Sequence, residues 1–405
     1  MRRGTNLPAV GSFNQSVILE LIRRAPGGIS RAEIAVKTGL VPQTVSNAAK
    51  LLVEQGIVVE AGTLVQGPGK PPVILRLEPR SRFAVGVHID PGFVTYVLVN
   101  LAGQVVARSM HRTPSPQDPG AVVAEIVEQI ASLARTAAVD KSRILGIGLA
   151  TPGPIDAARG IMVDPPLMMG WWHVPIRDAV ASAAGMDVVF DKEVTAAAAA
   201  EVWFGEPNRQ NFAVIYLSAG IGTGLVLDGN VIRGATGNAG DGGRIIVYDS
   251  GVPKAPSQQL GHLVTPEYLV RQAIDEGVLP ANPDDTETSF ERLLADAEVG
   301  RPGALAILHR AGRNLASAIL TLINVLDLPE IVFAGPYWER LSPLVFPTIA
   351  YVVQTSEIRS TRHAIKFSLS RVGVEIGAVG AACLVLDTLL SPRPSSLLIT
   401  DPARP

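Results

Sequence analysis

Apolar residues recur at the spacing of helices in three short stretches before residue 60. The first stretch lies between residues 17 and 22 and predicts a helix that is capped near Asn14 or Ser16. Gly27-Gly28 follows and is expected to stop this helix. The same spacing then returns twice at short intervals, so the sequence predicts a compact group of three helices.

The second and third helices have clear boundary signals. Ser30 and Glu33 have the spacing of a capping box, and a turn at Gly39 is expected to close the second helix. Pro42 suits the first position of the third helix, which Gly56 ends. The inward face of the third helix follows helical spacing and comprises Val45, Ala48, Ala49 and Leu52.

Polar side chains cover the other face of the third helix, and two β-rich runs follow it. Two short helices joined by a tight turn are typical of a helix-turn-helix, whose amide and basic groups bond base edges or phosphates in the major groove. The runs Ile57–Glu60 and Val73–Leu77 flank a Gly- and Pro-rich tip at residues 67–72, which predicts a wing. We predict DNA contacts from Arg31, Pro42, Gln43, Thr44, Ser46, Asn47, Lys50 and, on the wing, Lys70.

Beyond residue 80 the pattern alternates between short apolar runs and longer amphipathic stretches. Such alternation indicates an α/β fold. Strands are predicted at 82–89, 95–101, 105–108, 144–149, 188–190, 212–217, 225–227 and 330–333. Helices are predicted at 122–138, 195–204, 305–325 and 377–390.

A glycine-rich segment, Ser218–Gly224, lies between two of the predicted strands. Its glycine spacing is similar to a dinucleotide fingerprint, but that motif must open a helix. Here β-branched residues and an Asp228-Gly229 turn follow, so the chain is expected to re-enter a strand. A glycine hairpin either presents backbone amides to a phosphate or simply bends sharply, and the sequence leaves both possibilities open.

The length of the chain and the distribution of its charges predict more than one domain. With 405 residues it is too long for one compact core. Residues 1–80 hold ten Lys or Arg and five Asp or Glu, a balance of +5, against −7 for the remaining residues. This asymmetry predicts a basic module attached to an acidic body.

The cysteine content and the hydropathy of the sequence indicate in which cellular compartment the protein is expected. Cys383 is the single cysteine, which excludes an intrachain disulfide and a Cys-rich zinc site. No apolar segment follows Met1-Arg2-Arg3, and no run of about 18 apolar residues lacks a charge or turn signal. We therefore expect a cytoplasmic protein with neither a secretory signal nor contact with a membrane.

The order of these motifs resembles the ROK family (repressors, open reading frames and kinases), in its winged-helix repressor branch of the xylose-repressor type. The resemblance covers almost the whole length and includes the helix-turn-helix and the Gly-Lys-Pro wing. In the body it rests on Gly86–Asp90, Gly148–Asp156, Gly170-Trp171, Ala196–Glu201, Ser218–Gly229, Gly237–Gly243 and residues 377–382. The family implies an N-terminal winged helix-turn-helix followed by a two-lobed, actin-like, sugar-kinase-like ATPase fold with a sugar pocket between the lobes.

The resemblance also implies boundaries between domains. We expect the winged helix-turn-helix at residues 1–78 and a first actin-like lobe at 79–198, completed by a C-terminal helix at 375–392. The second lobe is expected at 199–374, and a flexible tail at 393–405.

The chain departs from the kinase motifs of the family. The kinases' first phosphate loop corresponds to residues 90–94, where Phe93 places a ring at a close backbone approach. Their Asn-Asp pair, whose Asp is the catalytic base, corresponds to Lys192 and Glu193. Ala219 replaces a hydroxyl residue, and Pro336 removes an amide donor near the adenosine position. Because phosphoryl transfer depends on such positioning groups, we expect no kinase activity and no ATP cofactor.

A structural zinc of the family is not expected either. Arg244 stands where the family has a zinc-ligating His, and residues 245–262 contain no cysteine. The six histidines of the chain are scattered without the spacing of metal ligands. The sequence therefore predicts no metal site.

The altered pocket keeps groups that suit a hydroxylated ligand. The candidates for effector binding are Asp90, Lys192, Glu193, Asn238, Asp241 and Arg244. Their two cations favour an anionic effector such as a sugar phosphate or sugar acid. The alternative is that Arg244 pairs with Asp241 or Glu193 and holds an empty cleft shut.

Together these patterns predict a DNA-binding transcriptional regulator, a repressor of carbohydrate-related genes. Its expected partners are double-stranded DNA with a palindromic operator, a sugar or sugar-derived effector, and further copies of itself in a homodimer or homotetramer. Ligand in the cleft would change the spacing of the two reading heads. Two alternatives stay open: an active sugar kinase with an appended DNA-binding module, and an architectural DNA-binding protein whose body only dimerises.

Overall fold

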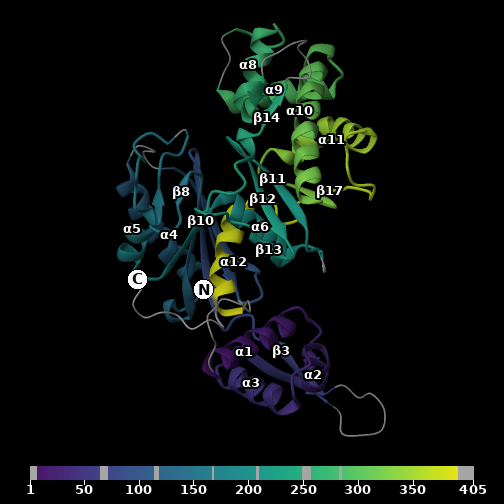
Figure 1. The fold of residues 1–405 in the computed structure, drawn as a ribbon. Coiled ribbons are helices and arrows are strands. Elements are labelled where there is room, and N and C mark those ends of the chain that lie inside the picture. Colours follow the sequence, from purple (N-terminus) through teal and green to yellow (C-terminus); the bar gives the residue numbers. More distant parts are fainter. Residues whose placement is uncertain are drawn as a thin grey trace.

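The computed structural model describes residues 7–63, 72–113, 118–166, 168–206, 209–248, 257–281 and 285–390. A small helical head lies at one end of a body that has two lobes, each built around a five-stranded sheet (Figure 1). Helix α12 (Ile376–Leu390) runs from the body towards the head. Within the described ranges no helix is both long and apolar enough to span a membrane.

The head is a three-helix unit with a small antiparallel sheet in the order β1-β3-β2. Its elements are α1 (Leu7–Arg23), β1 (Ile29–Ser30), α2 (Arg31–Thr38), α3 (Pro42–Glu54), β2 (Val58–Thr63) and β3 (Val73–Leu77). All four residues of the predicted inward face of α3 are buried. The predicted start of the first helix is wrong, because α1 already begins at Leu7 and Asn14 and Ser16 lie inside it. Most of the predicted wing tip, with Lys70, lies outside the described residues.

Helix α2 begins and ends with the predicted caps. The Ser30 hydroxyl accepts a hydrogen bond from the Glu33 backbone N–H at 3.2 Å, and the Glu33 carboxylate accepts one from the Ser30 N–H at 2.8 Å. The Ser30 N–H and the Ser30 hydroxyl both donate to the Glu33 carboxylate, and these two hydrogen bonds hold the pKa of Glu33 below its usual value. Gly39 follows the last turn with a φ of 70°, a left-handed conformation that glycine adopts without strain.

Replacing Ser30 by Ala is expected to destabilise the head by about 1 kcal/mol, because the first turn of α2 loses its side-chain acceptor. The measurement is urea unfolding of the full chain followed by circular dichroism. Ser30→Thr is the matched control, since it keeps a hydroxyl at the cap and should stay close to the parent. Equal stability of Ser30→Ala and the parent would contradict this role of the cap.

The sheet of the first lobe has the strand order β10-β7-β4-β5-β6. The strands are β4 (Phe83–Ile89), β5 (Phe93–Asn100), β6 (Val105–Arg112), β7 (Ile144–Thr151) and β10 (Val188–Lys192). β10, β7 and β4 are parallel, whereas β4, β5 and β6 form an antiparallel meander. Helices α4 (Pro119–Thr136) and α5 (Ile176–Ala184) pack on one face, and α12 packs on the other.

The sheet of the second lobe has the order β13-β12-β11-β16-β17. Its strands are β11 (Phe212–Leu217), β12 (Ile221–Leu227), β13 (Asn230–Val231), β16 (Glu330–Ala334) and β17 (Lys366–Leu369). Helices α10 (Pro302–Leu326) and α11 (Trp338–Thr355) cover one face, and α6 (Glu193–Phe204) covers the other. The glycine-rich loop is shorter than predicted, because Gly222 and Gly224 pair with β11 as part of β12.

Smaller elements complete the body. They are β8 (Ile155–Asp156), β9 (Ile161–Met162), β14 (Ile246–Tyr248), β15 (Ser257–Gln259), α7 (Gly261–Val264), α8 (Pro266–Asp275), α9 (Thr286–Glu298) and two 3-10 turns at Lys141–Arg143 and Gly242–Arg244. The hydrophobic pattern did not predict α5, α8, α9 or α11. The division of the lobes expected between residues 198 and 199 falls inside α6.

Helix α12 packs backbone against backbone on its neighbours. A side chain at Gly86 of β4 would collide with the carbonyl oxygen of Ala378, and one at Gly148 of β7 with that of Ala381. On the helix itself, a side chain at Gly380 would collide with the carbonyl oxygen of Ala196 in α6. Glycine at these positions therefore lets α12, α6 and the sheet form one closely packed unit.

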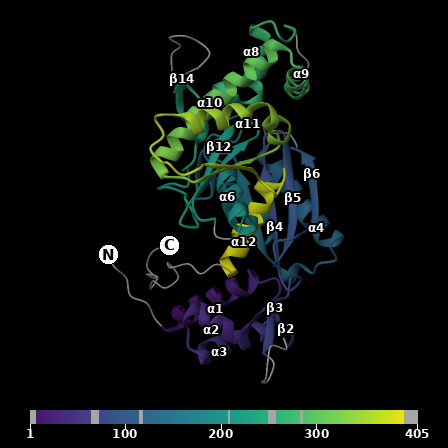
Figure 2. The ribbon, with the colours of Figure 1, turned by 90° about the vertical axis from the view of Figure 1, so that its right-hand side faces the viewer.

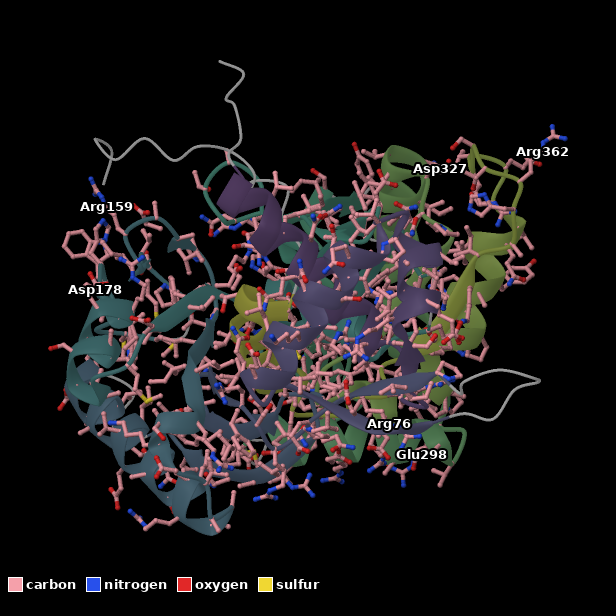
Figure 3. The ribbon with its side chains drawn as sticks, turned by 90° about the horizontal axis from the view of Figure 1, so that it is seen from below. Arg76, Arg159, Asp178, Glu298, Asp327 and Arg362 are labelled. Atoms are coloured by element: carbon pink, nitrogen blue, oxygen red, sulfur yellow. The ribbon has the colours of Figure 1, made fainter. Side chains whose placement is uncertain are left out.

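The head and the body share a hydrophobic core. Ile18 and Ile22 of α1 belong to the same buried cluster as Cys383 and Leu386 of α12. Trp203, near the end of α6, also belongs to this cluster. Figure 2 shows the head directly below α12, and Figure 3, seen from below, shows it in front of the body.

Polar contacts reinforce this junction. The indole N–H of Trp203 donates a hydrogen bond to the Asp387 carboxylate of α12 at 2.6 Å. The guanidinium carbon of Arg23, the last residue of α1, lies 4.2 Å from the centroid of the Trp203 ring. Trp203 thus connects α1, α6 and α12.

Candidate functional site

The predicted base-reading residues lie on the solvent side of α3. Gln43, Asn47 and Lys50 are exposed, whereas the opposite face of the helix is buried in the head. The Gln43 side-chain amide donates a hydrogen bond to the Asn47 side-chain oxygen at 2.8 Å, which orients both amides on one face. Pro42 is exposed at the first position of the helix, and Thr44 and Ser46 are half-buried.

Two of the predicted basic contacts have carboxylate partners in the free chain. Arg31 forms an ion pair with Glu60 of β2 at 2.7 Å, and the Lys50 ammonium lies 3.7 Å from the Glu54 carboxylate. Solvent-exposed pairs of this kind contribute about 0–1 kcal/mol. DNA phosphates can therefore replace these carboxylates at small cost.

A pocket of about 710 Å³, open solvent included, lies between the two lobes. It is lined by the turn after β4, residues 152–154, the start of α6, the Ser218–Gly222 segment and residues 240–244. Five of the six predicted effector residues line it, namely Asp90, Lys192, Glu193, Asp241 and Arg244.

Asn238, the sixth predicted effector residue, supports the pocket wall instead of lining the pocket. Its side-chain oxygen accepts a hydrogen bond from the Ile155 N–H at 2.8 Å, and its amide donates to the Ile155 carbonyl at 2.6 Å. The backbone carbonyl of Asn238 accepts a hydrogen bond from the Lys192 ammonium at 3.3 Å, and that of Ala239 accepts one at 3.4 Å. Burial lowers the pKa of Lys192, and the negative charge of Asp241 opposes this shift.

Arg244 pairs with Asp241, its neighbour in the same turn. The guanidinium Nε lies 3.0 Å from the Asp241 carboxylate, and the two side chains are 64% and 53% exposed. The ion pair between Arg244 and Asp241 that the alternative interpretation expects is therefore present. The pair is exposed and weak, so a ligand can compete for either partner.

His88 is not predicted from the sequence as a partner of the pocket residues, but the structure places it beside Glu193. It is buried on β4, and its Nε2 lies 3.2 Å from a carboxylate oxygen of Glu193 at the start of α6. Burial lowers the pKa of His88, but the hydrogen bond and charge of Glu193 outweigh burial and raise it above the usual value. The available signal is the closeness of His88 and Asp90 in sequence, because His88 lies at the end of β4 and Asp90 directly follows this strand.

Asp90 completes this group. The backbone N–H of Gly92 donates a hydrogen bond to one Asp90 carboxylate oxygen at 3.0 Å. Burial raises the pKa of Asp90, while the charge of His88 and the Gly92 hydrogen bond oppose the rise. The ligand atoms of His88, Asp90 and Glu193 all lie within 4.8 Å of one another, so these three side chains could hold a metal ion.

Phe93 does not enter the pocket. It begins β5, and its ring centroid lies 5.8 Å from the guanidinium carbon of Arg112. Pro91 lines the pocket at this turn. The expected obstruction of a phosphate by the Phe93 ring is therefore not seen in the described residues.

Comparison with known proteins gives a consistent picture. Residues 85–388 match the model of the ROK family, and residues 12–63 match that of the MarR family. The chain is 26% identical over 374 residues to a xylose repressor of Caldicellulosiruptor bescii, covering 90% of this chain and 93% of that protein. It is 25% identical over 317 residues to a glucokinase of Halalkalibacterium halodurans, covering 75% of this chain and 95% of that enzyme.

A solved structure extends the match to the whole fold. The crystal structure of a ROK family transcriptional regulator, a homologue of the Escherichia coli MLC protein, aligns with a TM-score of 0.77 at 22% identity. The alignment covers 94% of this chain and 98% of that chain. The predicted winged helix followed by a two-lobed sugar-kinase-like body is thereby confirmed.

Proposed function

The chain belongs to the ROK family, and from that premise we propose that it is a transcriptional repressor of sugar-related genes. The observation that carries this proposal is the exposed polar face of α3, on a winged-helix head that is packed against the body. The similarity to a repressor extends over 90% of the chain, which supports the same architecture of head and sensor. We infer that the pocket between the lobes binds a sugar or sugar-derived effector.

The two helices that reach the head begin beside the pocket. α6 starts with Glu193, which lines the pocket, and its Trp203 lies against Arg23 of the head. The first turn of α12 approaches His88 at Gly377, where an added side chain would collide with the His88 ring. A ligand that binds one arrangement of the lobes more tightly would shift both helices and so the head. In a homodimer on a palindromic operator, this shift changes the spacing of the two reading heads.

We further propose that the body has lost phosphoryl transfer. Lys192 and Glu193 occupy the positions of the kinases' Asn-Asp pair, and the Glu193 carboxylate is engaged by His88. The Lys192 ammonium is held by backbone carbonyls of residues 238 and 239. A longer carboxylate and a bonded ammonium thus replace the kinases' aspartate and amide, which supports a binding role and no need for ATP.

The purified full chain is expected to bind promoter DNA of sugar-utilisation genes and to release it when one sugar or sugar derivative is added. The measurement is a gel shift with promoter fragments chosen by mapping the bound DNA across the genome. A coupled assay for ADP with the same sugar panel should stay at background, with a bacterial glucokinase as the positive control.

Two other outcomes would each contradict this proposal. ADP formation with a monosaccharide, without retention of any promoter fragment at low ionic strength, would support the active kinase. DNA binding that no sugar, sugar phosphate or nucleotide alters, together with an unchanged melting temperature, would support the architectural alternative.

A further inference from the structure

Two carboxylates that line the pocket between the lobes, those of Asp90 and Glu193, converge with the buried imidazole of His88. His88 lies on β4, Asp90 follows directly after that strand, and Glu193 is the first residue of α6. Their ligand atoms all lie within 4.8 Å of one another. Parallel pairing of β4, β7 and β10 brings the ends of β4 and β10 to the same edge of the sheet, and so brings Glu193 beside the other two.

Neighbouring groups fix the orientation of these side chains. The Gly92 N–H donates a hydrogen bond to one oxygen of the Asp90 carboxylate at 3.0 Å, and the Ser218 side chain also bonds this carboxylate. The His88 ring lies against Gly377, where even a methyl group would crowd it, and its edge contacts the Tyr216 ring at a centroid distance of 6.1 Å. Such outer contacts are typical of metal sites, where they hold the ligands in register.

The charges of the group favour a cation. Two carboxylates lie close together in a largely buried place, and like charges at this distance repel each other strongly. Apart from His88 itself, the nearby cations bond elsewhere, because Lys192 is directed at two backbone carbonyls and Arg244 at Asp241. A divalent cation between a neutral imidazole and two carboxylates would balance the charge.

We propose that His88, Asp90 and Glu193 bind a divalent transition-metal cation such as Mn²⁺ or Zn²⁺. One nitrogen and two oxygen donors suit these ions better than Ca²⁺, which takes oxygen ligands. Asp90 and Glu193 line the pocket, so the remaining coordination positions of the cation are open to it. This site is separate from the family zinc site, whose expected position in this chain is occupied by Arg244.

The full chain, freed of metal with a chelator, is expected to bind one Mn²⁺ per chain, measured by the loss of the electron paramagnetic resonance signal of free Mn²⁺. Asp90→Asn should weaken binding about 100-fold or more, because it removes a direct ligand and even outer partners contribute 10- to 100-fold. Asp178→Asn is the control. It removes an exposed carboxylate of α5 outside the pocket and should leave Mn²⁺ affinity unchanged.

Co²⁺ gives a second readout. Its visible absorption should change on binding to the parent and not to His88→Gln, because the imidazole nitrogen would be a ligand. The proposal is overturned if the parent binds Mn²⁺, Zn²⁺ and Co²⁺ no more tightly than Asp90→Asn, or if Asp178→Asn loses affinity to the same degree. Asp90 is partly exposed, so Asp90→Asn is expected to fold and still tests the proposal if His88→Gln does not fold. No DNA or sugar enters these measurements, and their failure leaves the proposed repressor standing.

Discussion

Replacing Gln43 and Asn47 together by Ala is expected to remove most of the sequence-specific DNA binding of this chain. Both amides lie on the exposed face of α3 and orient each other through a 2.8 Å hydrogen bond. Each amide that bonds a base through paired hydrogen bonds contributes about 1–3 kcal/mol of discrimination. The double variant should therefore bind its operator about 30- to 10⁴-fold more weakly than the parent.

Fluorescence anisotropy at fixed salt, with an operator duplex and a shuffled duplex, measures this effect. The double variant should lose affinity for the operator and keep its affinity for the shuffled duplex. Gln55→Ala is the matched control, since it removes an exposed amide just after α3 and should change neither value. If the double variant binds the operator as tightly as Gln55→Ala, then α3 does not read the bases.

Replacing Trp203 by Ala is expected to lower the stability of the full chain by about 3–5 kcal/mol. The ring is 8% exposed in the core that joins the head to the body. Its loss would leave a cavity there and remove both the hydrogen bond to Asp387 and the contact with Arg23. The head would then be held less firmly on α6 and α12.

Chemical unfolding followed by circular dichroism measures this difference. The control is Trp172→Ala, because Trp172 is 73% exposed and a surface substitution changes stability by about 0.5 kcal/mol or less. Equal losses in the two tryptophan variants would mean that the junction does not stabilise the chain. In that case the head would be a separate unit on a tether, and α6 would not position it.

The head could be predicted well because its signals are local. Ser30, Gly39 and Pro42 define helix ends through neighbours a few residues away, and the structure places them as predicted. The start of α1 was missed because Pro8 and Gly11 interrupt the pattern, and neither residue favours the interior of a helix. Helix α11 was missed for the same reason, since Pro343 and Pro347 both lie within it.

The pocket could be predicted only through family resemblance, because its members are far apart in sequence. No spacing rule joins His88 to Glu193, which come together through the pairing of parallel strands. Asn238 was assigned to the effector because its amide suits sugar hydroxyls, yet its partners are backbone groups of Ile155. Such partners depend on which loops meet, and a single sequence does not contain that information.

The place of α12 in the chain has a consequence for biosynthesis. The ribosome makes the head first, but the helix on which its apolar side rests is residues 376–390 and emerges near the end of translation. Throughout that interval the nascent chain carries bare apolar surface on α1 and on β4, a condition that invites chaperone binding and aggregation. A stop codon before residue 376 would thus leave this apolar surface of the head uncovered, although it leaves every residue of the head intact.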